Sequence, residues 1–158
     1  MKIGVLSDTH SRELPSKMLS AFKGVDIIVH AGDICCEETL NFLKKINEVK
    51  AVSGNMDELS IKELLPDHLT FNVEEVTVGV FHGKGPSKDA LSAAKEMFED
   101  TDVDIVIFGH SHIPFNQKIK GVLFFNPGSP NDTIFAPYCS YGLIEIDKDQ
   151  ISSQIICV

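Results

Sequence analysis

Short runs of valine and isoleucine alternate, in the first half of the chain, with segments whose apolar residues recur at helical spacing. The runs Lys2–Ser7, Asp26–Ala31 and Lys50–Ser53 predict strands, and the segments Pro15–Lys23 and Glu37–Asn47 between them predict helices. Strands that alternate with helices pair in parallel, because each helix carries the chain back over the sheet in a right-handed crossover. This half therefore predicts a β-α-β-α-β unit.

The second half is richer in strands and contains one amphipathic helix, which we expect to begin at an N-cap Ser87. The expected elements are a hairpin of Leu69–Val73 and Val76–Phe81, the helix Ser87–Glu99, and strands at Asp104–Phe108, Val122–Phe125, Tyr141–Asp147 and Ile151–Cys157. Strands as apolar as DIIVHA and DIVIF need cover on both faces. Two packed sheets with helices outside would provide that cover. A length of 158 residues suits a single domain over 1–158.

The composition excludes several classes of protein. Hydrophobic residues make up 43% and charged residues 23%, which is typical of a globular chain. The net charge is −9 and Arg12 is the only arginine, so no nucleic acid polymer is expected as a partner. No apolar run approaches the roughly 18 residues of a membrane span, and the N-terminus lacks the features of a signal peptide. We therefore expect a cytoplasmic protein without a membrane segment.

Nearly every expected strand leads, at its carboxyl end, into side chains that bind metals. These candidate ligands are Asp8, His10, Asp33, Asn55, His82, His110 and His112. The carboxyl ends of strands are where sites form in open α/β sheets, so we expect one cluster. A mixed set of imidazole, carboxylate and amide donors suits Mn, Fe, Zn, Ni or Co rather than a thiolate-bound metal.

The local spacing of these residues supports the same cluster. Asp8 and His10 are two residues apart, as are His110 and His112, and residues at this spacing on an extended backbone point to the same side. Each motif alone is commonly a turn or a pair of surface histidines. The placement of all of them at strand ends is what favours a metal centre.

Taken in order, the motifs Asp8-x-His10, Gly32-Asp33, Gly54-Asn55-x-Asp57, His82 and Gly109-His110-x-His112 resemble the five blocks of the calcineurin-like metallophosphoesterase superfamily. The short chain resembles the small phosphodiesterase branch of that family, and the segment NPGSP at 126–130 is similar to the loop after its last block. The resemblance implies an α/β fold, a four-layer α/β/β/α sandwich of two mixed sheets flanked by helices.

The resemblance also implies a dinuclear centre of two divalent transition metal ions (Mn, Ni, Fe, Zn or Co), with Mn or Ni favoured. Asp8, His10 and His112 would bind one ion, Asn55, His82 and His110 the other, and Asp33 would bridge them. A hydroxide shared by two such ions has a pKa lowered toward neutrality and attacks phosphorus. The implied function is therefore metal-dependent hydrolysis of small phosphate diesters.

Several residues around the ligands have candidate roles. Asn55 and Asp57 are candidate catalytic residues: the Asn55 amide would contact a phosphate oxygen, and Asp57 would orient a neighbouring ligand or form a turn rather than act as a base. Arg12 and Lys84 are candidate phosphate contacts, although solvated surface cations are an equal alternative. Met56 stands where larger members of the family have a histidine that protonates the leaving group, so we expect a preference for good leaving groups.

Two alternatives stay open beside the phosphodiesterase. One is a phosphomonoesterase or nucleotidase of the same fold. The other is a non-catalytic scaffold that resembles the retromer subunit of this fold. All seven ligand positions are filled, and two buried carboxylates would be costly without a metal, which weighs against the scaffold. Because small members of this branch are commonly oligomeric, a homo-oligomer is also left open.

Overall fold

Ten strands form two mixed five-stranded sheets in the computed structural model, which describes residues 1–158. The strands are β1 (Lys2–Leu6), β2 (Ile27–His30), β3 (Glu48–Ala51), β4 (His68–Val73), β5 (Val76–Phe81), β6 (Ile105–Phe108), β7 (Phe115–Ile119), β8 (Val122–Asn126), β9 (Ser140–Asp147) and β10 (Gln150–Cys157). The first sheet has the order β10-β9-β1-β2-β3 and the second the order β4-β5-β6-β8-β7. In the first sheet β1, β2 and β3 are parallel, and in the second β5, β6 and β8 are parallel.

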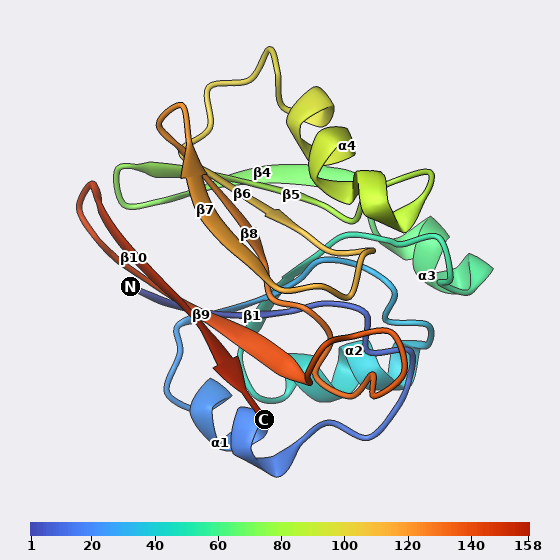
Figure 1. The fold of residues 1–158 in the computed structure, drawn as a ribbon. Coiled ribbons are helices and arrows are strands. Elements are labelled where there is room, and N and C mark those ends of the chain that lie inside the picture. The colour runs from blue at the N-terminus through green and yellow to red at the C-terminus, as the bar shows by residue number, and fades with distance from the viewer.

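The helices form the outer layers. They are α1 (Ser16–Phe22), α2 (Glu37–Lys44), α3 (Leu59–Leu64) and α4 (Ala90–Met97), and the 3-10 turn η1 (Ser87–Asp89) leads into α4. Figure 1 shows α1 and α2 on the outer face of the first sheet and α4 on the outer face of the second. The four layers are therefore α/β/β/α, which confirms the expected fold. No helix is long and apolar enough to span a bilayer.

The core between the sheets explains why the central strands are continuously apolar. In β6, Ile105 and Ile107 belong to the cluster of 16 buried residues between the two sheets. Val106 and Phe108 belong instead to the cluster that includes Ala90 and Ala94 of α4. Because alternate residues of a strand point to opposite faces, a strand covered on both sides needs apolar residues at every position. The outer face of the first sheet packs on α1 in the same way, through Met18 and Phe22.

The structure corrects several of the expected elements. The helix expected over Ser87–Glu99 begins as a 3-10 turn and is α-helical only over Ala90–Met97. Ser87 is not its N-cap, because Pro86 precedes the turn and no side chain caps it. The third strand lies at Glu48–Ala51, two residues before the expected Lys50–Ser53. Most other ends differ from the expected ones by one to three residues, as helix and strand ends commonly do.

Two elements were not expected at all. Strand β7 (Phe115–Ile119) lies at the edge of the second sheet and exposes its three central residues, Asn116, Gln117 and Lys118, so it shows no apolar alternation. Helix α3 (Leu59–Leu64) has six residues and buries only Ile61. Neither segment carries the periodic apolar pattern that identifies an element in a sequence.

Candidate metal centre

The loops that follow β1, β2 and β6 hold candidate ligands in an unusual backbone conformation. Five of the seven candidates have positive φ angles, and they are Asp8, His10, Asp33, His110 and His112. Such angles are uncommon for residues other than glycine and are found mainly where the surrounding structure enforces them. The expectation that each i, i+2 pair lies on extended backbone is therefore wrong. Neighbouring loops hold these turns in place instead, since His10 N donates to Asp33 O at 3.0 Å and Asp8 N donates to Gly32 O at 3.0 Å.

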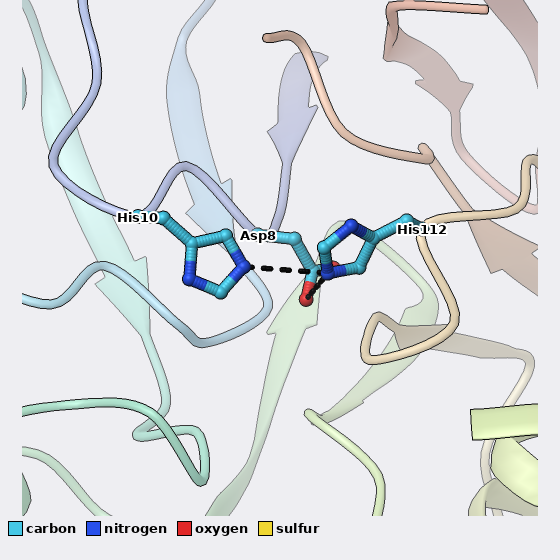
Figure 2. A group of neighbouring side chains, drawn as sticks. All are labelled: Asp8, His10 and His112. Atoms are coloured by element: carbon cyan, nitrogen blue, oxygen red, sulfur yellow. Dashed lines mark hydrogen bonds and ion pairs between the residues drawn. The ribbon is translucent and has the colours of Figure 1, made fainter. Parts of the chain in front are cut away.

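Asp8, His10 and His112 form one group whose ligand atoms all lie within 4.8 Å of one another. His112 Nε2 is 3.3 Å from Asp8 Oδ1 and 3.3 Å from His10 Nε2. Figure 2 shows the three side chains converging from two loops, with Asp8 and His10 after β1 and His112 after β6. Two imidazole nitrogens and a carboxylate oxygen that converge in this way are a common ligand set for a divalent ion.

Asp8, Asp33 and His82 form the second group. His82 Nε2 lies 3.3 Å from Asp33 Oδ2 and 3.9 Å from Asp8 Oδ1. His82 Nδ1 donates to the Ala31 carbonyl at 2.7 Å, so Nε2 is the atom left to bind a metal. Asp8 belongs to both groups, and Asp33 Oδ2 is also 3.9 Å from His10 Nε2, so both carboxylates face imidazoles of the two groups.

Asn55 and His110 lie beside the second group rather than within it. Asn55 Oδ1 is 3.1 Å from His82 Nε2. The His110 ring is 5.1 Å from the His82 ring, and its Nε2 donates to the Gly85 carbonyl at 2.8 Å. That hydrogen bond leaves Nδ1 of His110 available. The structure thus brings all seven candidate ligands to one edge of the two sheets.

The residues present fit divalent cations. Asp8 Oδ1 is buried and has no hydrogen-bond partner, although the imidazoles of His82 and His112 both face it. A buried carboxylate oxygen without a partner is costly, and a metal ion would satisfy it. Asp33 is also buried, being 2% exposed.

The electrostatics show how the site is balanced by protons when no metal is bound. Burial alone would lower the pKa of His112, but the carboxylates of Asp8 and Asp132 outweigh burial and raise it to about 9. Burial would raise the pKa of Asp8, yet His112 and His82 hold it below its usual value. The pKa of Asp33 is likewise lowered, chiefly by His82 against the effect of burial. A cation that binds at this site would therefore displace protons.

Asp57 shapes the loop that carries Asn55. Asp57 is buried, its Oδ1 accepts Cys35 N at 2.6 Å, and its Oδ2 accepts Gly54 N at 2.6 Å. Because both oxygens are engaged by backbone amides, Asp57 ties the loop after β3 to the loop after β2. It does not line the cavity at the metal centre.

A cavity of about 460 Å³ opens over the candidate ligands. Its walls are His10, Arg12, Asp33, Asn55, Met56, Ser87, His110, Ser111, His112, Asp132 and Phe135. Arg12 is thus placed at the site, with its Nη1 donating to the Asn131 carbonyl at 3.3 Å. Lys84 lines a neighbouring cavity of about 590 Å³ that shares Asn55 and His110 with the first, and its Nζ lies 3.7 Å from Glu96. Another cavity of about 460 Å³, beside α4, contains no candidate ligand.

Sequence reasoning missed several residues of the cavity wall, and two of these, Asp132 and Phe135, lie beside His112. Asp132 accepts a hydrogen bond from His112 Nδ1 and is 2% exposed. The Phe135 ring lies 6.4 Å from the His112 ring. Both belong to the loop between β8 and β9. One feature of the sequence could have identified Asp132, which is the only acidic residue between Asn126 and Ser140.

Comparison with known proteins points to one family. The sequence model of the calcineurin-like phosphoesterase superfamily domain matches residues 1–149. A "Probable metallophosphoesterase" of Methanocaldococcus jannaschii is 39% identical over 82% of this chain and 68% of its own length. Another from Methanothermobacter thermautotrophicus is 32% identical over 99% of this chain and 92% of its own length.

Solved structures share the fold at lower identity. The structure described as a novel archaeal phosphodiesterase superposes with a TM-score of 0.77 at 22% identity and covers 99% of this chain and 100% of that one. Vps29 of Entamoeba histolytica, solved in complex with Zn, superposes with a TM-score of 0.78 at 24% identity, and the match covers 99% of each chain. From a match that spans nearly its whole length and from these relatives, we conclude that the chain belongs to the calcineurin-like phosphoesterase superfamily.

Proposed function

We propose that this phosphoesterase is a phosphodiesterase that works with two divalent transition metal ions. One observation carries the proposal: the buried carboxylates of Asp8 and Asp33 face imidazoles from both groups, and one oxygen of Asp8 accepts no hydrogen bond. Asp8, His10 and His112 would hold one ion. Asn55, His82 and His110 would hold the other, with Asp33 between the two.

When bound, the two ions would activate a water and polarise the phosphoryl group. The side chains of this chain do the rest. His82 and His112 are held by hydrogen bonds at Nδ1, so their Nε2 atoms face the carboxylates before any metal arrives. The Asn55 amide would contact a phosphate oxygen, and Arg12 would offer a positive charge in the same cavity.

The shape and charge of the site favour a diester over a monoester. Two cavities meet at Asn55 and His110, so there is space on both sides of the centre for the two substituents of a diester. Arg12 is the one permanent cation in the wall of the central cavity, which suits the single negative charge of a diester better than the second charge of a monoester. A relative named phosphodiesterase, from Methanocaldococcus jannaschii, is 25% identical over 81% of this chain.

The test compares bis-p-nitrophenyl phosphate with p-nitrophenyl phosphate on metal-stripped protein, with Mn, Ni, Co, Zn or Mg restored one at a time. We expect metal-dependent turnover that is faster with the diester, and Mn or Ni to support it best. Equal or faster turnover of the monoester would make the protein a phosphomonoesterase. Metal binding without turnover of either substrate would instead favour the scaffold.

A further inference from the structure

The loop between β8 and β9 aims one buried carboxylate at a metal ligand. Asp132 Oδ2 accepts the Nδ1 proton of His112. Its other oxygen, Oδ1, accepts the backbone amides of Ile134 at 2.8 Å and Phe135 at 3.2 Å. One oxygen of Asp132 therefore holds His112, and the other holds the loop on which Asp132 lies.

That loop is itself fixed to the end of β1. Ser129 Oγ donates to the Asp8 carbonyl at 2.8 Å and accepts Asp132 N at 3.2 Å. Asn131 Nδ2 donates to the Thr9 carbonyl at 3.1 Å. These bonds set the position of Asp132 relative to Asp8. His112 lies between the two carboxylates, since its Nδ1 donates to Asp132 and its Nε2 is 3.3 Å from Asp8 Oδ1.

His112 differs from the other candidate imidazole ligands in what holds it. His82 and His110 donate to backbone carbonyls, and His10 Nδ1 contacts the neutral Cys35 Sγ at 3.5 Å. A carboxylate partner fixes the tautomer and raises the basicity of the nitrogen that binds the metal, more than a neutral partner does.

We propose that Asp132 is a positioning residue that orients His112 and strengthens metal binding at the group formed by Asp8, His10 and His112. The proposal rests on the proposed metal centre. It predicts that the two metal-binding steps respond differently to changes at Asp132, because His82 and Asp33 have no contact with its carboxylate.

The variant Asp132→Asn tests this, because its carboxamide oxygen can still accept the His112 proton but carries no charge. We expect calorimetry with Mn²⁺ to show one binding step weakened by about 10-fold to 100-fold, with the other unchanged. The signal of the His112 Nδ1 proton in ¹H–¹⁵N spectra should shift as well. Thermal unfolding of the metal-free variant establishes that it is folded, and Asp132→Glu serves as a second variant that retains the charge and should keep most of the affinity.

Asp67→Asn is the matched control, because Asp67 Oδ1 accepts His68 Nδ1 at 2.8 Å in an exposed pair that contains no candidate metal ligand. Its metal binding should equal that of the wild type. Two unchanged binding steps in folded Asp132→Asn would overturn the proposal for Asp132 alone. A wild-type protein that binds no metal would overturn the proposed function as well.

A different observation bears on the substrate. Two large apolar side chains, Met56 and Phe135, line the central cavity and are 60% and 77% exposed. The remaining wall residues are polar or charged. Exposed apolar surface beside a polar site often marks where a ligand binds.

From this we infer that the diester carries a planar apolar group, such as an aromatic ring, which packs on Phe135. The inference rests on the proposed phosphodiesterase activity. Phe135 is well placed for it, because its ring lies edge-on to His112 at 6.4 Å and so reaches a group esterified to phosphorus at the centre. Aromatic rings that pack on one another bind more tightly than burial of their surface alone would provide.

The test uses phenyl p-nitrophenyl phosphate and methyl p-nitrophenyl phosphate, which share one leaving group. We expect Phe135→Ala to lower the phenyl-to-methyl ratio of kcat/KM by about 10-fold, mainly through KM. Ile134→Ala is the control, since Ile134 is 72% exposed and does not line the cavity. Calorimetry with phenylphosphonate and methylphosphonate makes the same comparison without turnover.

An unchanged ratio in Phe135→Ala, or equal loss for both substrates, would overturn the inference while leaving the phosphodiesterase in place. No turnover of either substrate by the wild type would count against the proposed function itself.

Discussion

Gly54 and Asp33 approach each other so closely that no side chain fits between them. A Cβ atom on Gly54 would lie 2.2 Å from Asp33 Oδ1 and 2.4 Å from the Asp33 backbone nitrogen. The loop after β3 thus packs directly against the carboxylate that lies between the two candidate metal groups. Met56 N, from the same loop, donates to Asp33 Oδ1 at 2.8 Å.

Gly54→Ala should therefore displace Asp33 and weaken the metal centre. We expect the free energy of unfolding of the metal-free protein to fall by about 1–3 kcal/mol, because the new methyl group meets backbone that cannot move freely. Metal affinity should fall at least 10-fold, as for other disturbances of ligand orientation. Chemical denaturation and calorimetry measure the two effects. Gly24→Ala is the control, since the nearest atom to its Cβ would be Ala21 O at an ordinary 3.6 Å; equal effects in both variants would contradict this account.

Met56→His should broaden the range of leaving groups. Met56 lines the central cavity and cannot donate a proton, whereas an imidazole there can act as a general acid. We expect the rate with an alkyl leaving group to rise by about 10-fold or more and the rate with p-nitrophenolate to change little. Kinetics across a series of leaving groups gives the slope of the logarithm of the rate against the pKa of the leaving group. Met56→Gln, which is polar but not an acid, should keep the wild-type slope, and an unchanged slope in Met56→His would show that position 56 does not reach the leaving oxygen.

Arg12→Gln should impair substrate binding more than Lys84→Gln does. Both cations are candidate phosphate contacts in the sequence, but Arg12 lines the central cavity while Lys84 lines the neighbouring one and pairs with Glu96. We expect Arg12→Gln to raise KM for the diester by roughly 3-fold to 10-fold, because a charge close to the phosphate is lost. Lys84→Gln should change KM by less than about 2-fold, because an exposed ion pair such as Lys84–Glu96 contributes little free energy. The reverse order would place the phosphate in the Lys84 cavity.

The fold was predictable because its main signals are local. Strand β6 is apolar at every position because both of its faces are covered, by residues of the first sheet such as Ile144 across the core and by α4 outside. The polar residues after β1 and β2 were predictable for a similar reason. Parallel strands of one sheet end at one edge, so Asp8 and Asp33 had to come close together, whereas His82 follows β5 of the second sheet and joins them only through the packing of the two sheets.

What could not be predicted depends on contacts between distant segments. Asp132 follows no strand directly, and it reaches His112 only because Ser129 and Asn131 attach its loop to the end of β1. The left-handed backbone of the ligand loops has the same origin. A dipeptide such as His10-Ser11 does not favour positive φ by itself, but hydrogen bonds from both amides to Asp33 O and Ile34 O hold it there.

The metal-free protein should lose stability as the pH rises through about 9. His112 has a pKa of about 9 in the folded state, raised by carboxylates against the effect of burial, compared with about 6.5 when unfolded. The stabilisation is therefore fully present below pH 6.5 and is lost as the pH rises through about 9. We expect its loss to cost about 1–3 kcal/mol. Urea unfolding measures the free energy of unfolding at pH 6.5 and at pH 9.5. The difference between the two values should be smaller in His112→Gln than in the wild type, and equal differences would show that His112 is not the group responsible.

Asp57→Asn separates a structural role of Asp57 from a catalytic one. The two oxygens of Asp57 each accept a backbone amide at 2.6 Å, from Cys35 and Gly54. An asparagine offers one oxygen and one NH₂ group, so one of these amides would face a donor and lose its partner. A buried amide without a partner costs about 1–3 kcal/mol, and we expect that loss in chemical denaturation. Asp104→Asn, whose carboxylate accepts Thr77 N at an exposed position, should cost much less. Activity should fall in step with metal affinity, because Asp57 acts through the Asn55 loop, whereas a rate loss with normal stability and normal metal affinity would identify Asp57 as a base.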